Sequence, residues 1–325
     1  MIAAIIVLLF IFIIGLCIGS FLNVVILRTL SEESIVFPAS KCPNCQTPLK
    51  WWHNIPVFSY IFLRGKCAFC KKPISIQYPI IELVTALVYT LLFLKFGFDI
   101  QTLYAWIVAA LLIVMAGTDI KEKVVYNIHT YALIIIGLLF AISSTVLNSI
   151  QFANINIEHM TLLSNPVTNG VLGAVLGFLI MEVLARTGYL FAGVRAFGEG
   201  DSWIAAGLGM VFGWHNIIII LIYSVIIQIA LFIPVFIARL IKQRDFKLLS
   251  SLIFFIIYAA TFYILNNHNA IPTGMIMILG ILILVLSGII CCYLLVKGLR
   301  NNTSDRTYLP FGPAMVIAGL IAMLL

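Results

Sequence analysis

Charged residues are scarce in this chain. Of its 325 residues, 12 are acidic and 19 are basic, whereas 63% are hydrophobic. This composition excludes a soluble globular protein, and apolar runs of about 20 residues recur, so we predict an all-α polytopic membrane protein. No basic residue precedes the first apolar run, and the first positive charge, Arg28, follows it. Because a signal peptide has the reverse pattern, we interpret this run as a retained span.

Ten apolar runs are candidate spans, and the sixth of them is short. They lie at about 2–27, 79–97, 100–118, 128–147, 168–190, 202–213, 216–238, 248–265, 273–296 and 309–325. With the N-terminus outside, 18 of the 19 basic residues lie on the inner side and only Lys95 lies outside. Ten spans therefore satisfy the positive-inside rule, and removing the sixth would move the later basic loops outside. The net charge of +7 reflects this topology and attraction to anionic lipids, so it does not indicate nucleic-acid binding.

Four of the seven cysteines lie in the one sizeable polar segment, 28–78. They form two CxxC pairs, Cys42/Cys45 and Cys67/Cys70, with 21 residues between the pairs. Each CxxC pair can form a tight turn, or knuckle, whose two sulfur atoms face one point. Two knuckles can complete a tetrahedral thiolate site for Zn²⁺ that leaves no open position for a metal-bound water. Metal binding would then supply much of the folding energy of this small segment. Two disulfides are the alternative, which a reducing cytosol disfavours.

Six of the acidic residues lie in or against the predicted spans, where an ionisable side chain is costly and is a functional candidate by default. They are Glu82, Asp119, Glu122, Glu182, Glu199 and Asp201. Asp119 ends the third span and Asp201 begins the sixth, so the predicted topology places both on the cytosolic side. Each also has an ordinary alternative role. Asp201 could be a helix N-cap, and Asp119 could be a solvated charge beside Lys121 and Lys123.

Together the two aspartates suggest a catalytic pair. Gly198 and Gly200 would let backbone or substrate approach Asp201 closely. Two carboxylates held close together in a low-dielectric site cannot both ionise, so one keeps a proton while the other stays charged. Such a pair can activate water and protonate a leaving amine. This is the chemistry of peptide hydrolysis by an aspartyl protease.

Four stretches carry a resemblance to a known family. They are GSFLNVVILR at 19–28, CPNCQTPLKWWHNIPVFSYIFLRGKCAFCKKPISIQYPIIE at 42–82, GEGD at 198–201 and YLPFGPAMVIAGL at 308–320. They resemble, in order, the first-span signature, the tetracysteine domain with the entry into the second span, the GxGD motif and the closing span of the bacterial type IV prepilin peptidases. These leader peptidase/N-methyltransferases are GxGD intramembrane aspartyl proteases.

The resemblance implies that Asp119 and Asp201 are the catalytic pair. It implies cleavage of prepilin and pseudopilin precursors after a glycine in a short basic leader, followed by N-methylation with S-adenosylmethionine. We expect a protein of the bacterial inner membrane, surrounded by the lipid bilayer, with its active site facing the cytosol and no nucleic-acid partner. The expected organisation is a first span at 1–27, a cytosolic tetracysteine zinc segment at 28–78, a catalytic transmembrane core at 79–247, an extra helical pair at 248–297 and a closing span at 298–325.

Two other functions remain open at this point. An ion-coupled transporter could use the aspartates to bind protons or cations, although the sequence shows no clear repeat and both aspartates fall at the membrane edge. A non-enzymatic assembly protein for pili or secretion could use the zinc segment for docking.

The site of the methyl donor has no recognisable glycine-rich loop. Segment 28–78 is the one predicted cytosolic segment large enough to help form such a pocket. Its Trp51 and Trp52 could cover an adenine ring, or they could be interfacial anchors. We therefore expect the zinc-ordered segment to support methyl transfer and the aspartates to support cleavage.

Overall fold

The computed structural model describes residues 2–151, 165–192, 195, 197–243 and 310–325, with further helical pieces between 250 and 290. The described elements are helical, and two isolated β-bridges accompany them. The helices are α1 (Ile2–Leu30), η1 (Trp51–Asn54), α2 (Phe58–Phe62), α3 (Gln77–Phe96), α4 (Ile100–Glu122), α5 (Asn127–Gln151), α6 (Pro166–Ala192), α7 (Glu199–Gln243) and α10 (Gly312–Leu324). The chain divides into two compact units, Met1–Ile227 with Pro310–Leu325, and Gln228–Leu309.

The described residues contain six helices that are long and apolar enough to cross a membrane, namely α1, α3, α4, α5, α6 and α7. The multi-pass, all-helical class is therefore found, but ten spans are not confirmed. Helix α10 has 13 residues, which is shorter than the roughly 20 needed to cross alone. The predicted pair at 248–297 lies largely outside the described residues. Within the compact unit Gln228–Leu309, the Tyr258 hydroxyl donates a hydrogen bond of 3.2 Å to the carbonyl of Gly280.

Helix α7 is interrupted at Gly213. A straight helix of its 45 residues would be about 68 Å long, roughly twice the apolar thickness of a bilayer. Gly213 has φ 82° and ψ 172°, a conformation that a residue with a side chain rarely adopts. The freed N–H of Trp214 donates to Asn169 Oδ1 of α6 at 3.0 Å. The break thus falls at the last residue of the predicted span 202–213, just before the predicted span 216–238.

Helices α1 and α3 pack unusually closely. Gly15 and Gly19 lie one turn apart on α1. A Cβ atom on Gly15 would come within 2.5 Å of the Cα of Ala86, and a Cβ atom on Gly19 would come within 2.6 Å of the Cα of Glu82. Small residues at this spacing allow two membrane helices to approach backbone to backbone. One turn later, Asn23 donates to the carbonyl of Tyr78 at 3.1 Å. The 19–28 stretch therefore holds the start of α3 against α1.

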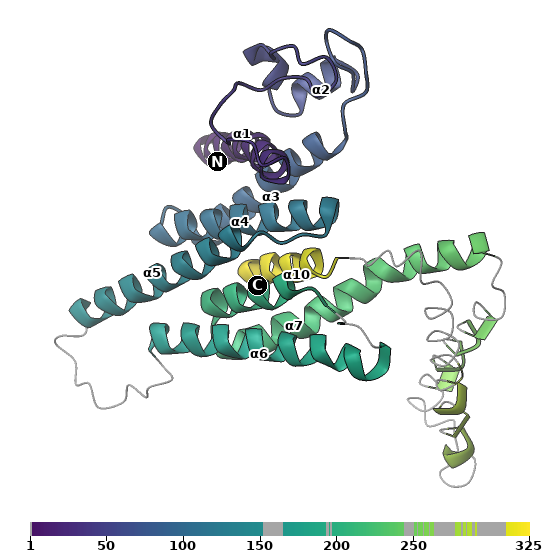
Figure 1. Cartoon of the computed structure of the whole chain (residues 1–325). Helices are drawn as coiled ribbons and strands as arrows, with labels where there is room; N and C mark the ends of the chain where they lie inside the picture. Colours follow the sequence, from purple (N-terminus) through teal and green to yellow (C-terminus); the bar gives the residue numbers. More distant parts are fainter. Residues whose placement is uncertain are drawn as a thin grey trace. The chain divides into compact units, whose positions relative to one another are not determined.

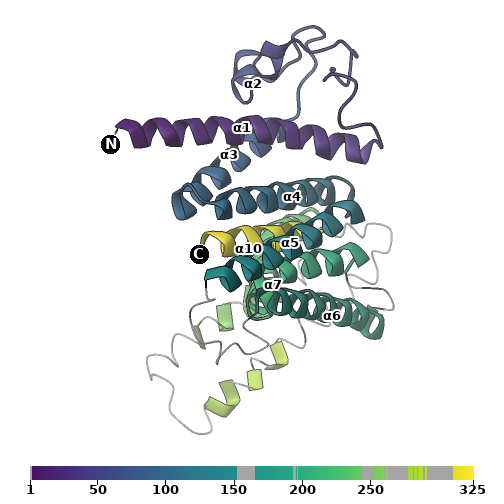
Figure 2. The ribbon, with the colours of Figure 1, turned by 90° about the vertical axis from the view of Figure 1, so that its left-hand side faces the viewer.

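Helices α4, α5, α7 and α10 share one hydrophobic core. Leu112, Leu133, Leu208 and Met315 contribute one fully buried side chain from each helix. Figure 1 shows the order of the layers, and Figure 2 shows α4, α10 and α5 next to one another. This core brings the end of α4 together with the starts of α7 and α10.

Candidate active site and metal centre

Asp119 lies in the last turn of α4 and is only 4% exposed. Its Oδ2 atom is buried and has no hydrogen-bond partner in the described chain. A side chain at Gly312, the first residue of α10, would overlap this oxygen and would approach Ile204 Cδ1 of α7 at 3.2 Å. By contrast, Lys121 and Lys123 are exposed. Burial therefore contradicts the alternative that Asp119 is a solvated charge.

Asp201 is 7% exposed and lies in the first turn of α7, which begins at Glu199. Its Oδ2 accepts a hydrogen bond of 3.1 Å from the backbone N–H of Gly198. This is the acidic half of a capping box, in which the third helical residue reaches back to the N-cap. The N-cap alternative is thus wrong in its position, because Gly198 occupies the N-cap and Asp201 reaches it from inside the helix.

The structure brings the two aspartates to the same end of the bundle. Gly312 of α10 packs against Asp119 Oδ2 and also against Ile204, which lies three residues after Asp201 on α7. Between the helices of the two aspartates lies the connection that follows α4. There, a Cβ atom on Gly200 would come within 2.5 Å of Val125 Cβ. The pair is therefore held by direct packing of the α4–α5 connection against the start of α7.

The two glycines around Glu199 give a matched pair of substitutions. Gly200→Ala should separate Val125 from the start of α7, because overpacking of this kind costs about 1–3 kcal/mol. We expect it to lower any reaction that needs both aspartates by up to about a hundredfold, because a displacement of about 1 Å in the catalytic geometry can have an effect of this size. Gly198→Ala should cost less than Gly200→Ala, because it keeps the backbone N–H and its Cβ would meet only Asp201 Oδ2, at 3.6 Å. Equal rates for both variants, measured on purified protein, would contradict this packing.

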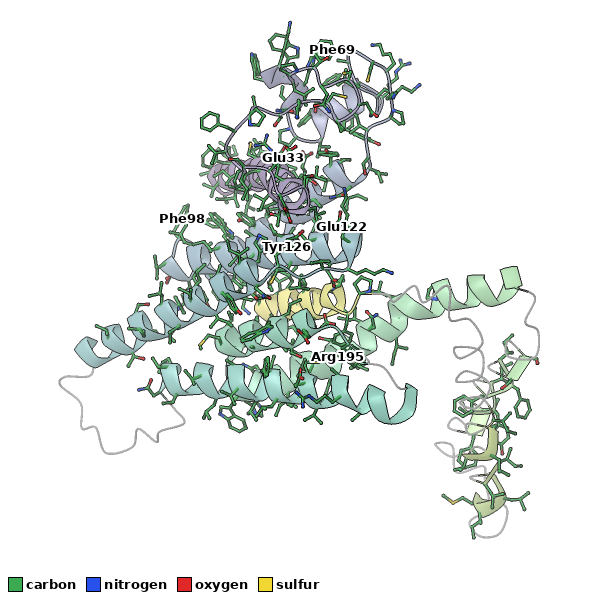
Figure 3. The ribbon with its side chains drawn as sticks, in the orientation of Figure 1. Glu33, Phe69, Phe98, Glu122, Tyr126 and Arg195 are labelled. Carbon is green, nitrogen blue, oxygen red and sulfur yellow. The ribbon has the colours of Figure 1, made fainter. Side chains whose placement is uncertain are left out.

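Arg195 is a residue that sequence reasoning did not single out. It lies between α6 and the start of α7 (Figure 3). Its guanidinium forms a bidentate salt bridge with Glu182 of α6, in which the two N–H···O distances are 2.5 and 3.3 Å. Its Nε also donates to the carbonyl of Phe197 at 2.9 Å. Ser202, the residue after Asp201, donates to the same Glu182 carboxylate at 3.3 Å. This network ties the approach to Asp201 onto α6, and the intramembrane position of Glu182 was its one sequence signal.

The network also reaches the second aspartate. The ring of Phe197 packs against Phe311, with 4.9 Å between the ring centroids. Phe311 precedes Gly312, whose backbone lies against Asp119. Arg195 therefore fixes a segment that contacts the surroundings of both carboxylates.

The remaining acidic candidates have other positions. The side chain of Glu199 is 84% exposed and lies 3.6 Å from Arg195. Glu122 is exposed at the end of α4. Glu82 is 5% exposed and accepts a hydrogen bond of 2.7 Å from the backbone N–H of Val57. It thereby joins α3 to segment 28–78.

The four predicted metal ligands converge on one point. The sulfur atoms of Cys42, Cys45, Cys67 and Cys70 all lie within 4.8 Å of one another, and all four cysteines are free thiols. The arrangement fits a metal ion held by four thiolates and does not contain the two disulfides of the alternative interpretation.

Both halves of this cluster have the same backbone geometry. In the first, Cys42 N–H donates to Thr47 at 3.0 Å and Lys41 bridges to Pro48. In the second, Cys67 N–H donates to Lys72 at 2.9 Å and Lys66 bridges to Pro73. Gln46 and Lys71 follow the second cysteine of each pair, with φ of 57° and 59°. The CxxC spacing therefore produces two equivalent knuckles.

The hydrogen bonds of the cluster favour thiolates at some positions. Bonds from the Thr47 side chain and backbone lower the pKa of the Cys45 thiol to about 6. Backbone bonds from Cys70 and Phe69 lower the pKa of Cys67. A backbone bond from Lys72 also favours the thiolate of Cys70, but burial and the other three sulfurs raise its pKa to about 11. A divalent cation would remove this mutual repulsion, so the donor set fits a bound metal.

Comparison with known proteins identifies relatives for most of the chain. Residues 13–96 match the family model "Bacterial Peptidase A24 N-terminal domain", and residues 106–233 match "Type IV leader peptidase family". No solved structure matches significantly.

Several curated relatives share the name prepilin leader peptidase/N-methyltransferase. The protein of Neisseria gonorrhoeae is 31% identical over 258 residues, which cover 72% of this chain and 83% of the relative. The Klebsiella pneumoniae protein is 33% identical, over 63% of this chain and 85% of the relative. The Myxococcus xanthus protein is 31% identical, but the match covers 66% of this chain and only 59% of that relative's length.

Proposed function

Because the chain belongs to the type IV leader peptidase family, we propose that it is a membrane-embedded aspartyl peptidase and N-methyltransferase that processes prepilins. The observation that carries the peptidase part is the convergence of two buried carboxylates, Asp119 and Asp201, at one end of the helical core, where Gly312 packs against both Asp119 and Ile204 of α7. The relatives' names support both activities. The structure also supports a metal role that is separate from cleavage, since the four cysteines form a closed set of ligands.

In the proposed reaction, one carboxyl group is ionised and the other is protonated. The ionised carboxylate takes a proton from a water molecule as that water attacks the scissile carbonyl, and the protonated carboxyl group supplies a proton to the leaving amine. Burial of both groups keeps bulk water away and strengthens their electrostatic effect on the reacting atoms. The Gly198 N–H steadies Asp201, and the missing side chain at Gly312 makes room for Asp119 Oδ2 against α10.

We further propose that the substrates are prepilin and pseudopilin precursors with short basic leaders, cut after a glycine on the cytosolic face of the inner membrane. The relatives' names support the substrate class, and the basic residues of the chain support the orientation. Cys42, Cys45, Cys67 and Cys70 would hold Zn²⁺, which would give segment 28–78 its fold. Because four thiolates leave no site for water, chelators of exchangeable metal should not stop cleavage.

The test of the function uses a bacterial host that lacks its own prepilin peptidase. Co-expression of this chain with a defined prepilin should convert the precursor to its shorter mature form. A matched precursor, with the last leader residue changed from glycine to valine, should stay uncut. If the first precursor also stays uncut while the protein is present in the membrane, the proposal fails. Proton or cation flux in vesicles containing the chain would then support the transporter alternative.

Arg195 gives a prediction about positioning. Arg195→Met should lower cleavage by up to about a hundredfold, because small displacements of catalytic groups have effects of this size. Arg195→Lys keeps the charge but loses the planar guanidinium that binds both oxygens of Glu182, so it should retain only part of the cleavage rate. The matched control is Arg186→Met, since Arg186 contacts the same Glu182 carboxylate at 2.8 Å but is 73% exposed. Equal losses for Arg186→Met and Arg195→Met in the purified protein would contradict a positioning role.

A further inference from the structure

A cavity of about 590 Å³ lies between segment 28–78 and the ends of α1 and α3. This volume is within the range of about 300–1,000 Å³ that small-molecule sites occupy. Cys42 and Cys67 line one side, so a metal in the tetracysteine cluster would shape the cavity wall. Figure 3 shows Glu33 near the end of α1 and Phe69 in the tetracysteine segment. The aspartate pair is not part of the lining.

The lining carries charges of both signs. The Arg28 guanidinium also lines the cavity, but it already donates to three backbone carbonyls. Of the other charged side chains, Lys41, Lys72 and Lys121 contribute three ammonium groups, and Glu33 and Glu82 contribute two carboxylates. None of these five forms an ion pair in the described part of the chain. An anionic lipid headgroup would match only the lysines, and a basic leader peptide would match only the acids. A single small molecule that carries both a carboxylate and positive groups matches the lysines and the acids of the lining together.

Glu82 is the buried carboxylate of this cavity, and the backbone that holds it is strained. Val57 has φ 62° and ψ −50°, and Phe58 N–H donates to the carbonyl of Pro56 at 2.6 Å. This is a γ-turn of the rare, strained form, centred on a β-branched residue that disfavours positive φ. The turn points the Val57 N–H at Glu82 Oε2, at 2.7 Å. Strain of this kind concentrates at ligand sites, where it holds a group ready for binding.

Two further features suit a purine. Flat rings of His53, Tyr60 and Tyr78 line the cavity. His53 Nδ1 is buried and has no hydrogen-bond partner in the described chain. Buried polar atoms are nearly always paired in folded proteins, so this atom lacks a partner that a ligand could supply.

Resting on the proposed methyltransferase function, we infer that this cavity binds S-adenosylmethionine, with Glu82 facing a positive group of the donor. The donor carries an adenine ring, a carboxylate, an ammonium group and a sulfonium, which together match the lining. Trp51 and Trp52, which sequence analysis offered as an adenine cover, are 75% and 45% exposed and do not line the cavity. Lys121 lies two residues beyond Asp119, so the cavity adjoins the helix end at which cleavage would free the amine.

The test is calorimetric titration of the full-length, zinc-loaded chain in detergent with S-adenosylmethionine. Glu82→Gln can still accept the Val57 hydrogen bond but loses its charge, so affinity should fall about tenfold or more. Ser59→Trp fills the cavity from α2 and should abolish binding. The matched controls are Glu122→Gln, an exposed acid outside the lining, and Ile61→Trp, at an α2 residue that is 63% exposed. Both should bind like the wild type, and zinc content near one per chain confirms that each variant is folded.

Two outcomes overturn the assignment in different ways. If the wild type binds the donor and both cavity variants bind equally well, the donor site lies elsewhere and the proposed function stands. If the wild type binds no donor but cleaves prepilin, the methyltransferase part of the proposed function falls together with the cavity assignment.

Discussion

Asp119→Asn and Asp201→Asn should each reduce prepilin cleavage by at least about a thousandfold, because catalytic groups that act as a unit lose nearly all activity when either is removed. Asparagine keeps the size of the side chain and removes only the ionisable carboxyl group. The measurement is the cleavage rate of a defined prepilin by each purified variant in detergent. Both side chains are buried in the described core, so each variant must also be shown to insert and fold.

Glu199→Gln is the matched control for this pair. Glu199 lies two residues before Asp201 in the same glycine-rich stretch, but its side chain is 84% exposed. Its substitution should change the rate only a few-fold. Near-normal cleavage by either asparagine variant, or a loss for Glu199→Gln as large as theirs, would contradict the assignment of Asp119 and Asp201.

Cys67→Ser should remove most of the metal from the protein. Elemental analysis should find about one zinc per wild-type chain and much less in the variant, because structural zinc sites contribute roughly 10–16 kcal/mol of binding free energy that three thiolates cannot match. Segment 28–78 should then become sensitive to proteolysis. Methylation of a pre-cleaved pilin with labelled S-adenosylmethionine should fall with the zinc content.

Asp201→Asn provides the opposite control, since it should still methylate the pre-cleaved pilin. Cys17→Ser controls for the loss of a thiol, because Cys17 is exposed on α1 and is not one of the four clustered cysteines. Zinc-free wild-type protein with oxidised cysteine pairs would refute the metal site. Methylation by Cys67→Ser at the wild-type rate would limit the zinc segment to a scaffold.

The parts of the fold that follow from local patterns could be predicted from the sequence. Apolar runs gave the described spanning helices, and the two CxxC pairs gave the convergence of four sulfurs. The position of the break in α7 matches the division into candidate spans 202–213 and 216–238, but its hydrogen bond to Asn169 of another helix could not be predicted from a local pattern. The count of ten spans came from apolar runs, with the short sixth one kept because of the loop charges, and the described residues contain six candidates.

The candidate site shows the same division. Asp119 and Asp201 were identifiable because acids are rare in an apolar chain. Arg195 was not, because its role depends on Glu182 in a different helix. Gly312 lies against Asp119 across 193 residues of sequence, and no local pattern carries such a contact. Trp51 and Trp52 show a different limit of sequence reasoning. Their aromatic character suggested a ligand contact, but residue type does not reveal exposure, and their exposure does not support that contact.

One measurement tests the central claim most directly, namely mass spectrometry of a defined prepilin after incubation with the purified wild-type chain. With S-adenosylmethionine present, we predict a leader peptide that ends in glycine and a mature product that carries a methyl group on its new N-terminus. Without the donor, the same cleavage should occur and the methyl group should be absent. An intact precursor after incubation with folded, zinc-containing protein would contradict the account.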